Sequence, residues 1–260
     1  MAGYTQGNLL FRNRYGLSPF FLVFGFFIFG LVSLWGGTTQ PAAAQPLFRA
    51  LLRQAPRISP EALQTALAAL DRLKASGAAI RSDVLTVIDY TKPSTEPRLW
   101  VFDLHHTRVL FEELVAHGRN TGDNRAVRFS NEPGSLMSSL GVFLTGDTYF
   151  GKHGLSLRLR GLEKGTNDKS MERAIVIHAA NYVSEKLGSY KGRIGRSWGC
   201  PAVRPEISRQ LIQTVQGGTV LLAYFPKKSW LATSPFADLK SPASVLRGQY
   251  PPAWPGTDKP

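Results

Sequence analysis

Residues 195–201 read Gly-Arg-Ser-Trp-Gly-Cys-Pro and contain Cys200, the only cysteine of the 260-residue chain. Upstream, residues 173–178 read Arg-Ala-Ile-Val-Ile-His, an apolar run that ends at His178. A cysteine is nucleophilic as its thiolate, and a neighbouring imidazole is the usual means of forming one. Gly199 lets the backbone and a substrate carbonyl approach the sulfur closely. We therefore expect a buried strand that delivers a histidine base to a cysteine held in a tight loop.

The N-terminal 44 residues have the features of an export signal. Arg12 and Arg14 precede an uncharged, mostly apolar run over residues 17–35. As a helix, this run spans roughly 28 Å, close to the thickness of a hydrocarbon core. A small-residue Ala-x-Ala site ends at Ala44, as in signal peptides that are cleaved. We predict a signal peptide or, if it is not cleaved, a membrane anchor through residues 17–35, with the rest of the chain in the periplasm or cell envelope.

If the chain is exported, two of its features need a new interpretation: the single cysteine and the excess of positive charge. Cysteines of exported proteins normally pair as disulfides, which one cysteine cannot do within its own chain. Cys200 is therefore predicted to be reactive, the alternative being a small buried hydrophobic residue. The chain has 31 Lys and Arg against 18 Asp and Glu, a balance that favours polyanionic partners. Outside the cell these are carboxylate-bearing wall polymer or an anionic membrane surface rather than nucleic acid, and solubility alone is the simpler explanation.

Hydrophobic periodicity predicts a mostly β fold, with one helix before the sheet and one after the cysteine loop. Ser59 and Pro60 predict the start of the first helix and Gly77 its end, and Pro205 predicts the start of the second. The predicted strands cover residues 84–90, 98–104, 109–117, 141–145, 148–150, 155–160, 173–178 and 219–225. The predicted divisions are residues 1–44 (signal or anchor), 45–79 (linker or arm over 45–58, then helix), 80–226 (the domain carrying the cysteine) and 227–260 (Pro-rich arm).

Two polar stretches need separate interpretation. Residues 118–139 are glycine-rich and lack periodicity, and a loop of this length in a compact domain is usually functional. It is expected to wall a substrate groove, with a disordered surface excursion as the alternative. His105 and His106 fall in a predicted hairpin turn, where adjacent side chains point apart, so we expect them to be solvated rather than metal-bound. No metal or cofactor is expected.

The segments around the cysteine and histidine resemble a known family. His178 is followed, after 18 residues, by Ser197-x-Gly199-Cys200, a pattern that resembles the YkuD-type L,D-transpeptidases of peptidoglycan. The strings over residues 149–156, 177–184 and 197–201 look like the divergent murein L,D-transpeptidase catalytic domain branch. The resemblance covers residues 80–226. It implies a β-sandwich or barrel-like catalytic fold that acts on peptidoglycan stem peptides.

The resemblance also implies roles for individual residues. Cys200 would attack an L,D peptide bond, and His178 would carry the proton. Ser197 would orient the loop, and backbone N–H groups around Gly199 would hold the oxyanion. An amine of a second stem would resolve the thioester into a crosslink; with water, the enzyme would be a carboxypeptidase. The predicted substrate-binding positions are Tyr149, His153, Asn181, Arg173, Arg196, Trp198 and Arg204. The arginines are candidates for stem carboxylates or else solvated surface charges, and the tyrosine and asparagine have no assigned role.

Three positions depart from the main family pattern. Trp198 stands in place of a histidine, Ala179 in place of a glycine, and Ala202 in place of an arginine or asparagine. These departures leave the nucleophile and base intact and bear on substrate details. A papain-like peptidase would place its cysteine before its histidine, and a metal hydrolase would need spaced His and acidic ligands, so neither fits. A peptidoglycan-binding module with an inert Cys200 is the non-enzymatic alternative.

Overall fold

Two helices precede the sheet in the described part of the protein, residues 44–237 of a computed structural model. α1 (Ala44–Gln54) packs Leu47 and Leu51 against the core, and the turn after it buries Ala55 and Ile58. The prediction of a linker or arm over residues 45–58 is therefore wrong. The apolar residues do recur at helical spacing, but the segment directly follows the predicted cleavage site and has no Ser, Thr, Asp or Asn cap immediately before it.

α2 (Pro60–Ser76) begins at Pro60 and ends before Gly77, as the sequence predicts. Gly77 has a left-handed φ of 81°, and its N–H donates to the Lys74 carbonyl, the usual glycine termination of a helix. Ser59 occupies the N-cap position, but its hydroxyl donates to Asp89 at the end of the first strand. The start of α2 is thus tied to the sheet.

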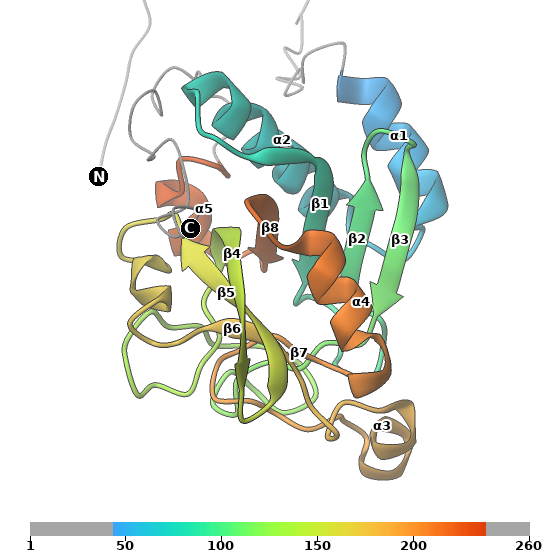
Figure 1. The fold of residues 1–260 in the computed structure, drawn as a ribbon, viewed down its shortest axis with the longest axis vertical. Coiled ribbons are helices and arrows are strands. Elements are labelled where there is room, and N and C mark those ends of the chain that lie inside the picture. Colours follow the sequence, from blue (N-terminus) through green and yellow to red (C-terminus); the bar gives the residue numbers. More distant parts are fainter. Residues whose placement is uncertain (1–43, 238–260) are drawn as a thin grey trace, which may run out of the picture. The chain divides into compact units, whose positions relative to one another are not determined.

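Eight strands form one mixed sheet in the order β3-β2-β1-β8-β4-β5-β6-β7 (Figure 1). β1 is parallel to β8 and β6 to β7, whereas the other neighbours are antiparallel. Ala116, beyond the end of β3, donates its N–H to the carbonyl of Ala202 in β7 at 2.8 Å. The sheet therefore nearly closes, which confirms the predicted barrel-like class. The strands are β1 (Arg81–Asp89), β2 (Leu99–Asp103), β3 (Arg108–Glu113), β4 (Gly141–Gly151), β5 (Gly154–Gly161), β6 (Val176–Ala179), β7 (Ala202–Val203) and β8 (Thr219–Tyr224).

β4 is one long strand where the sequence predicts two short ones. Its pairing with β5 shifts register between Thr145 and Thr148, so that Gly146 and Asp147 form an irregularity inside the strand. A bulge of this kind bends a strand without ending it. The bend separates a half of β4 that pairs with β8 from a half that projects with β5 as a hairpin.

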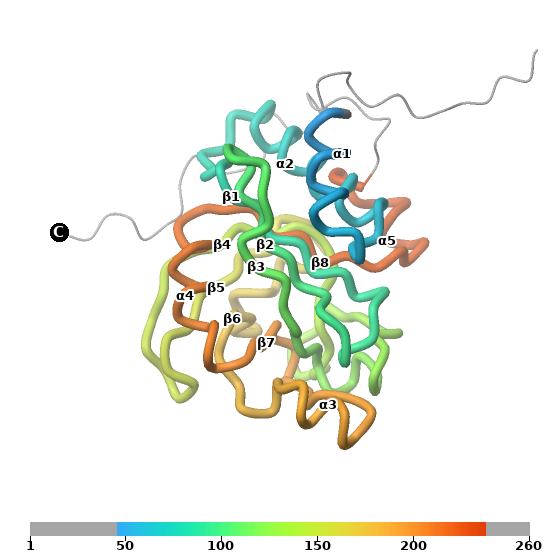
Figure 2. The backbone as a smooth tube through the Cα atoms, turned by 90° about the vertical axis from the view of Figure 1, so that its right-hand side faces the viewer, coloured from blue at the N-terminus to red at the C-terminus, as the bar shows by residue number. Residues whose placement is uncertain are grey.

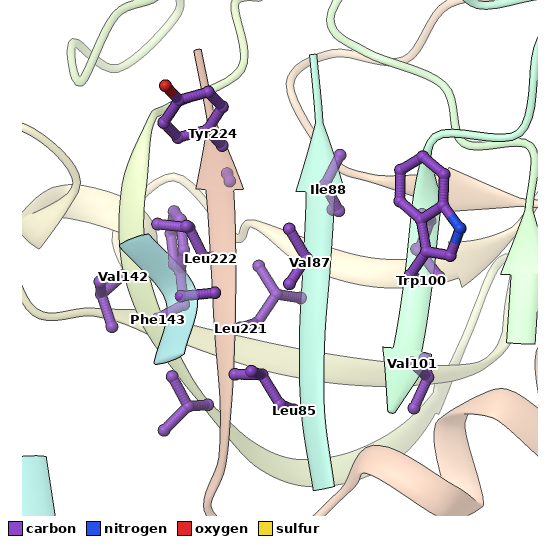
Figure 3. Close-up of a cluster of buried hydrophobic side chains, with 14 of the residues drawn as sticks. Leu85, Val87, Ile88, Trp100, Val101, Val142, Phe143, Leu221, Leu222 and Tyr224 are labelled. Atoms are coloured by element: carbon purple, nitrogen blue, oxygen red, sulfur yellow. The ribbon is translucent and has the colours of Figure 1, made fainter. Parts of the chain in front are cut away.

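Figure 3 shows core side chains carried by the neighbouring strands β2, β1, β8 and β4. Leu85, Val87, Leu221, Leu222 and Phe143 each expose 2% of their surface or less. Residues of β1 are buried at successive positions because α2 packs against β1 and β8, while α4 (Pro205–Val215) packs against β1, β5 and β6. Burial on both faces makes this part of the sheet a rigid support for its ends.

Two further helices lie outside the predicted set. α3 (Glu185–Lys191) is short and begins at Ser184, whose hydroxyl accepts from the Leu187 N–H. α5 (Lys228–Thr233) buries Trp230, and Phe236 is buried just after it. The first part of the predicted Pro-rich arm is therefore packed on the core, and residues 238–260 lie outside the described range. α3 lies at the end opposite to α1 and α2 (Figures 1 and 2).

The predicted signal or anchor over residues 1–44 falls almost wholly outside the described residues, including the apolar run over 17–35. Within residues 44–237, no helix combines the length and apolar character that crossing a bilayer requires.

Candidate active site

The predicted nucleophile and base lie on adjacent segments of the sheet. His178 in β6 pairs in register with Ala202 of β7, two residues after Cys200. The parallel β6–β7 pair thus brings together two residues that are far apart in the sequence. Strand pairing fixes the backbones of His178 and Ala202, and Cys200 lies in the loop two residues before this fixed point.

His178 is set up as a neutral proton acceptor. It is only 4% exposed, and its Nδ1 lies 2.9 Å from the carbonyl oxygen of Ala179. A carbonyl can only accept, so Nδ1 carries the hydrogen and Nε2 keeps a free lone pair. Burial lowers the pKa of His178, and the charges of His153 and Lys152 lower it further, against the opposing effect of the Ala179 bond. The imidazole is therefore uncharged at neutral pH.

Cys200 is a protonated thiol in this state. Its Sγ–H donates to the Ala174 carbonyl at 3.6 Å, and among the described residues no hydrogen bond joins the sulfur to His178. Burial raises the pKa of Cys200. The thiol and the imidazole are thus both neutral here, and transfer of the thiol proton to His178 stays a prediction. Catalytic hydrogen bonds are often long in free enzymes and tighten when substrate binds.

Three groups oppose the effect of burial on the sulfur. The N–H of Val176, the Arg173 guanidinium and the Lys152 ammonium each lower the pKa of Cys200. All three favour the thiolate, because a donor or positive charge near an anion stabilises it. The negative charge that forms during a reaction therefore has compensating groups already in place.

Ser197 and Gly199 shape the cysteine loop. The Ser197 hydroxyl donates to the Cys200 carbonyl at 2.6 Å and accepts from the Gly199 N–H at 3.0 Å. Gly199 has φ +130°, and a Cβ there would meet the Met137 carbonyl oxygen at 2.7 Å. The Ser197 hydroxyl thus bridges two backbone groups of the loop, and it occupies the Gly199 N–H. The N–H groups of Trp198 and Cys200 remain as the candidate oxyanion donors.

The long polar loop over residues 118–139 supports the cysteine loop. The N–H of Arg119 donates to the Ser197 carbonyl at 2.7 Å, and the Ser138 hydroxyl donates to the Gly199 carbonyl at 3.1 Å. Placement of the loop against the site excludes the alternative of a loose surface excursion. The role of Ser138 was not predicted, because nothing in the sequence distinguishes it from the other serines of this loop.

A buried Arg–His pair lies behind this support. Arg98 donates through Nε and Nη2 to the Val115 carbonyl, and its Nη2 lies 2.9 Å from His117 Nδ1. His117 is fully buried, and its carbonyl accepts from the Ser197 N–H at 2.9 Å. Burial and the Arg98 charge lower the pKa of His117 to about 3. The pair therefore anchors the cysteine loop with a histidine that must stay neutral.

Arg173, a predicted partner of stem carboxylates, is occupied by the protein. Its Nη1 donates to the Ser130 carbonyl at 2.8 Å and the Ser139 hydroxyl at 2.5 Å. Its Nη2 donates to the Ser135 hydroxyl at 3.2 Å and the Met137 carbonyl at 2.5 Å. Arg173 thus joins the long polar loop to the sulfur environment and is not placed as a free cation for a substrate.

The other two predicted arginines are also engaged. Arg196 donates to the Gly122 carbonyl at 3.0 Å and forms an ion pair with Asp123. Arg204 makes a two-bond ion pair with Glu113, at 2.7 and 2.8 Å. Both guanidinium groups are therefore already bound by other groups of the protein, which argues against their predicted role in binding stem carboxylates.

The tip of the β4–β5 hairpin lies over the site. The His153 ring stacks on the His178 ring, with centroids 4.4 Å apart. Lys152 Nζ lies 5.2 Å from the centroid of the Trp198 indole, which is 68% exposed. His153 was predicted to line the pocket, and its stacking agrees with that. Lys152 was not singled out, although it is the neighbour of His153 in the same string.

The remaining predicted residues contribute less. Tyr149 packs its ring against the Arg158 guanidinium, 4.4 Å from its centroid. Asn181 is exposed. In the range 44–237, no group of three or more His, Cys, Asp or Glu side chains has the arrangement of a metal site.

Comparison with known proteins gives the following matches. A family model described as "L,D-transpeptidase catalytic domain" matches residues 54–224. Among solved structures, an L,D-transpeptidase from Mycobacterium smegmatis is 13% identical (TM-score 0.33; 55% of this chain, 59% of that one). The helical cell shape determining protein Pgp2 from Campylobacter jejuni is 15% identical (TM-score 0.36; 66% and 60%), and Bdellovibrio bacteriovorus Bd1075 is 16% identical (TM-score 0.34; 55% and 48%). The matched region therefore spans between about half and three fifths of these chains. A comparison with curated proteins finds no match.

Proposed function

Because the chain belongs to the L,D-transpeptidase catalytic domain family, we propose that it is a peptidoglycan L,D-transpeptidase with Cys200 as its nucleophile. The observation that carries the proposal is the state of His178. Its Nδ1–H is bound to the Ala179 carbonyl, which leaves Nε2 able to take a proton on the strand beside the cysteine loop.

In the first half of the reaction, the Cys200 thiol is acylated. His178 Nε2 takes the Sγ proton as the sulfur attacks the carbonyl carbon of an L,D peptide bond in a stem peptide. Loop N–H groups stabilise the oxyanion of the tetrahedral intermediate. The carbon–nitrogen bond then breaks, the leaving amine takes the proton from His178, and a thioester remains on Cys200.

In the second half, an amine of another stem resolves the thioester. The amine attacks the thioester carbon and gives a proton to His178, and the carbon–sulfur bond breaks. The proton returns to the sulfur, so that the thiol is restored and a new amide joins two stems. Water in place of the amine would release a carboxylic acid, which is the carboxypeptidase alternative. A peptidoglycan-binding module with an inert Cys200 is the second alternative.

The site of action follows from the substrate. We propose that the chain works in the cell envelope, where peptidoglycan stems are both donor and acceptor, and that residues 1–44 carry it there. The excess of basic over acidic residues, 31 against 18, suits a polymer whose stems bear carboxylates.

Product analysis distinguishes these possibilities. The full-length protein and its Cys200→Ala variant are incubated with defined muropeptides, and the products are identified by mass. Crosslinked dimers from the wild type alone support the transpeptidase, and shortened stems alone indicate the carboxypeptidase. If wild type and Cys200→Ala give the same products, the proposal is refuted. A Lys186→Met variant, which changes an exposed residue of α3, controls for handling.

A further inference from the structure

Besides the arginines, which are bound by other groups of the protein, the candidate site contains the cation of Lys152. Arg173 donates to four oxygen atoms of the protein, and Arg204 is held by Glu113. Among residues 44–237, Lys152 forms no ion pair. It is exposed, and its ammonium lies over an indole that is itself mostly open to solvent.

The backbone holds this lysine firmly at the site. Lys152 and His153 form the two-residue tip of the hairpin, between the paired residues Gly151 and Gly154. Gly154, which follows the tip, has φ +75°, a left-handed conformation that glycine adopts without steric cost. Because the His153 ring stacks on His178, the tip is fastened to the catalytic base, and Lys152 is presented toward the cysteine loop.

We propose that Lys152 and Trp198 form the donor-specificity site, in which the ammonium binds the terminal α-carboxylate of the donor stem and the indole covers the residue that carries it. This inference rests on the proposed transpeptidase function and deepens it. It names the residues that would select a donor whose last peptide bond is the one cleaved.

The chemistry of the donor places its carboxylate near the sulfur. When the scissile bond is the last of the stem, the leaving residue carries its α-carboxylate three bonds from the attacked carbonyl carbon. A cation that recognises this group must therefore lie close to both catalytic residues. Lys152 meets this requirement, because its neighbour His153 stacks on His178 and its ammonium lies 5.2 Å from the centroid of the Trp198 ring, two residues before Cys200.

The two side chains suit complementary parts of such a residue. A lysine ammonium is a compact charge on a flexible stem, which suits a carboxylate that must depart after each cycle. An exposed indole beside it offers an apolar surface to the short side chain of the leaving residue.

The test compares two donors that differ only at the terminal group. A stem tetrapeptide with a free C-terminal carboxylate and its C-terminal amide are each offered with the same acceptor, and kcat/KM is measured for both. The full-length protein should prefer the carboxylate, and Lys152→Met should reduce that preference by about tenfold, the effect of one charge-assisted hydrogen bond. Lys152→Arg should keep most of the preference, and Lys186→Met, on exposed α3, should keep all of it.

The outcomes distinguish failure of the donor-specificity site from failure of the proposed transpeptidase function. If the wild type turns over both donors equally, or if Lys152→Met slows both by the same factor, the donor-specificity site is refuted and the transpeptidase stands. If the wild type converts neither donor, the proposed function fails and this inference fails with it.

Discussion

Replacing Arg173 with methionine should loosen the long polar loop from the site. The guanidinium donates to four oxygen atoms in residues 130–139. At about 1 kcal/mol each, these bonds would sum to about 4 kcal/mol. The side chain is half-buried and methionine keeps the apolar stem, so we expect the free energy of unfolding to fall by about 2–3 kcal/mol.

The same substitution should also lower the rate at which the Cys200 thiol reacts. Arg173 lowers the pKa of Cys200, so its loss raises that pKa and reduces the thiolate fraction at any pH below it. Unfolding in urea gives the stability, and the rate of alkylation by iodoacetamide at fixed pH gives the reactivity. Arg209→Met, which changes an exposed residue of α4, is the matched control. Unchanged stability together with a wild-type alkylation rate would refute the role assigned to this guanidinium.

Two further predictions concern the cysteine loop and its anchor. Gly199→Ala should cost at least about 2 kcal/mol and abolish turnover, because a Cβ would lie 2.7 Å from the Met137 carbonyl at φ +130°. Gly134→Ala, with φ +73° but open space, should cost only about 1 kcal/mol, and equal losses in urea unfolding would contradict the clash. Stability should fall as pH drops from 6.5 toward about 3, because unfolded His117 binds a proton that the folded residue excludes. The slope contributed is about 1.4 kcal/mol per pH unit, and a His117→Gln variant with an unchanged slope would exclude this source.

The sequence predicts much of the sheet, whereas the roles of Cys200 and His178 stay predictions. The strong apolar run over residues 219–225 corresponds to β8, and helix signals at Pro60, Gly77 and Pro205 mark real boundaries. These signals are local and do not depend on the rest of the fold. The strand predicted over 173–178 begins only at Val176, because Arg173 and Ala174 lie in a turn in which Ala174 has φ 50°. The 11-residue α1 has a clear apolar spacing as well, but it lacks a capping residue immediately before it, so its start could not be told from the preceding segment.

The roles of the charged residues could not be predicted in the same way. A sequence shows that Arg173 and Arg204 are cations, but their acceptors lie elsewhere in the chain and are set by the fold. The carbonyl groups that hold Arg173 come from an aperiodic loop. Lys152 could not be singled out from the sequence either, because its place at the site depends on the contact between the hairpin tip and Trp198 of the cysteine loop.

The parallel pairing of β1 with β8 has a consequence for how the chain acquires its structure. The two central strands come from opposite ends of the described sequence. A polypeptide emerging from the ribosome or a membrane pore presents β1 long before β8. Until the last strand arrives, β1 lacks one neighbour and much of the apolar interior has no partner. Assembly of this domain therefore waits until nearly all of the described chain has been made.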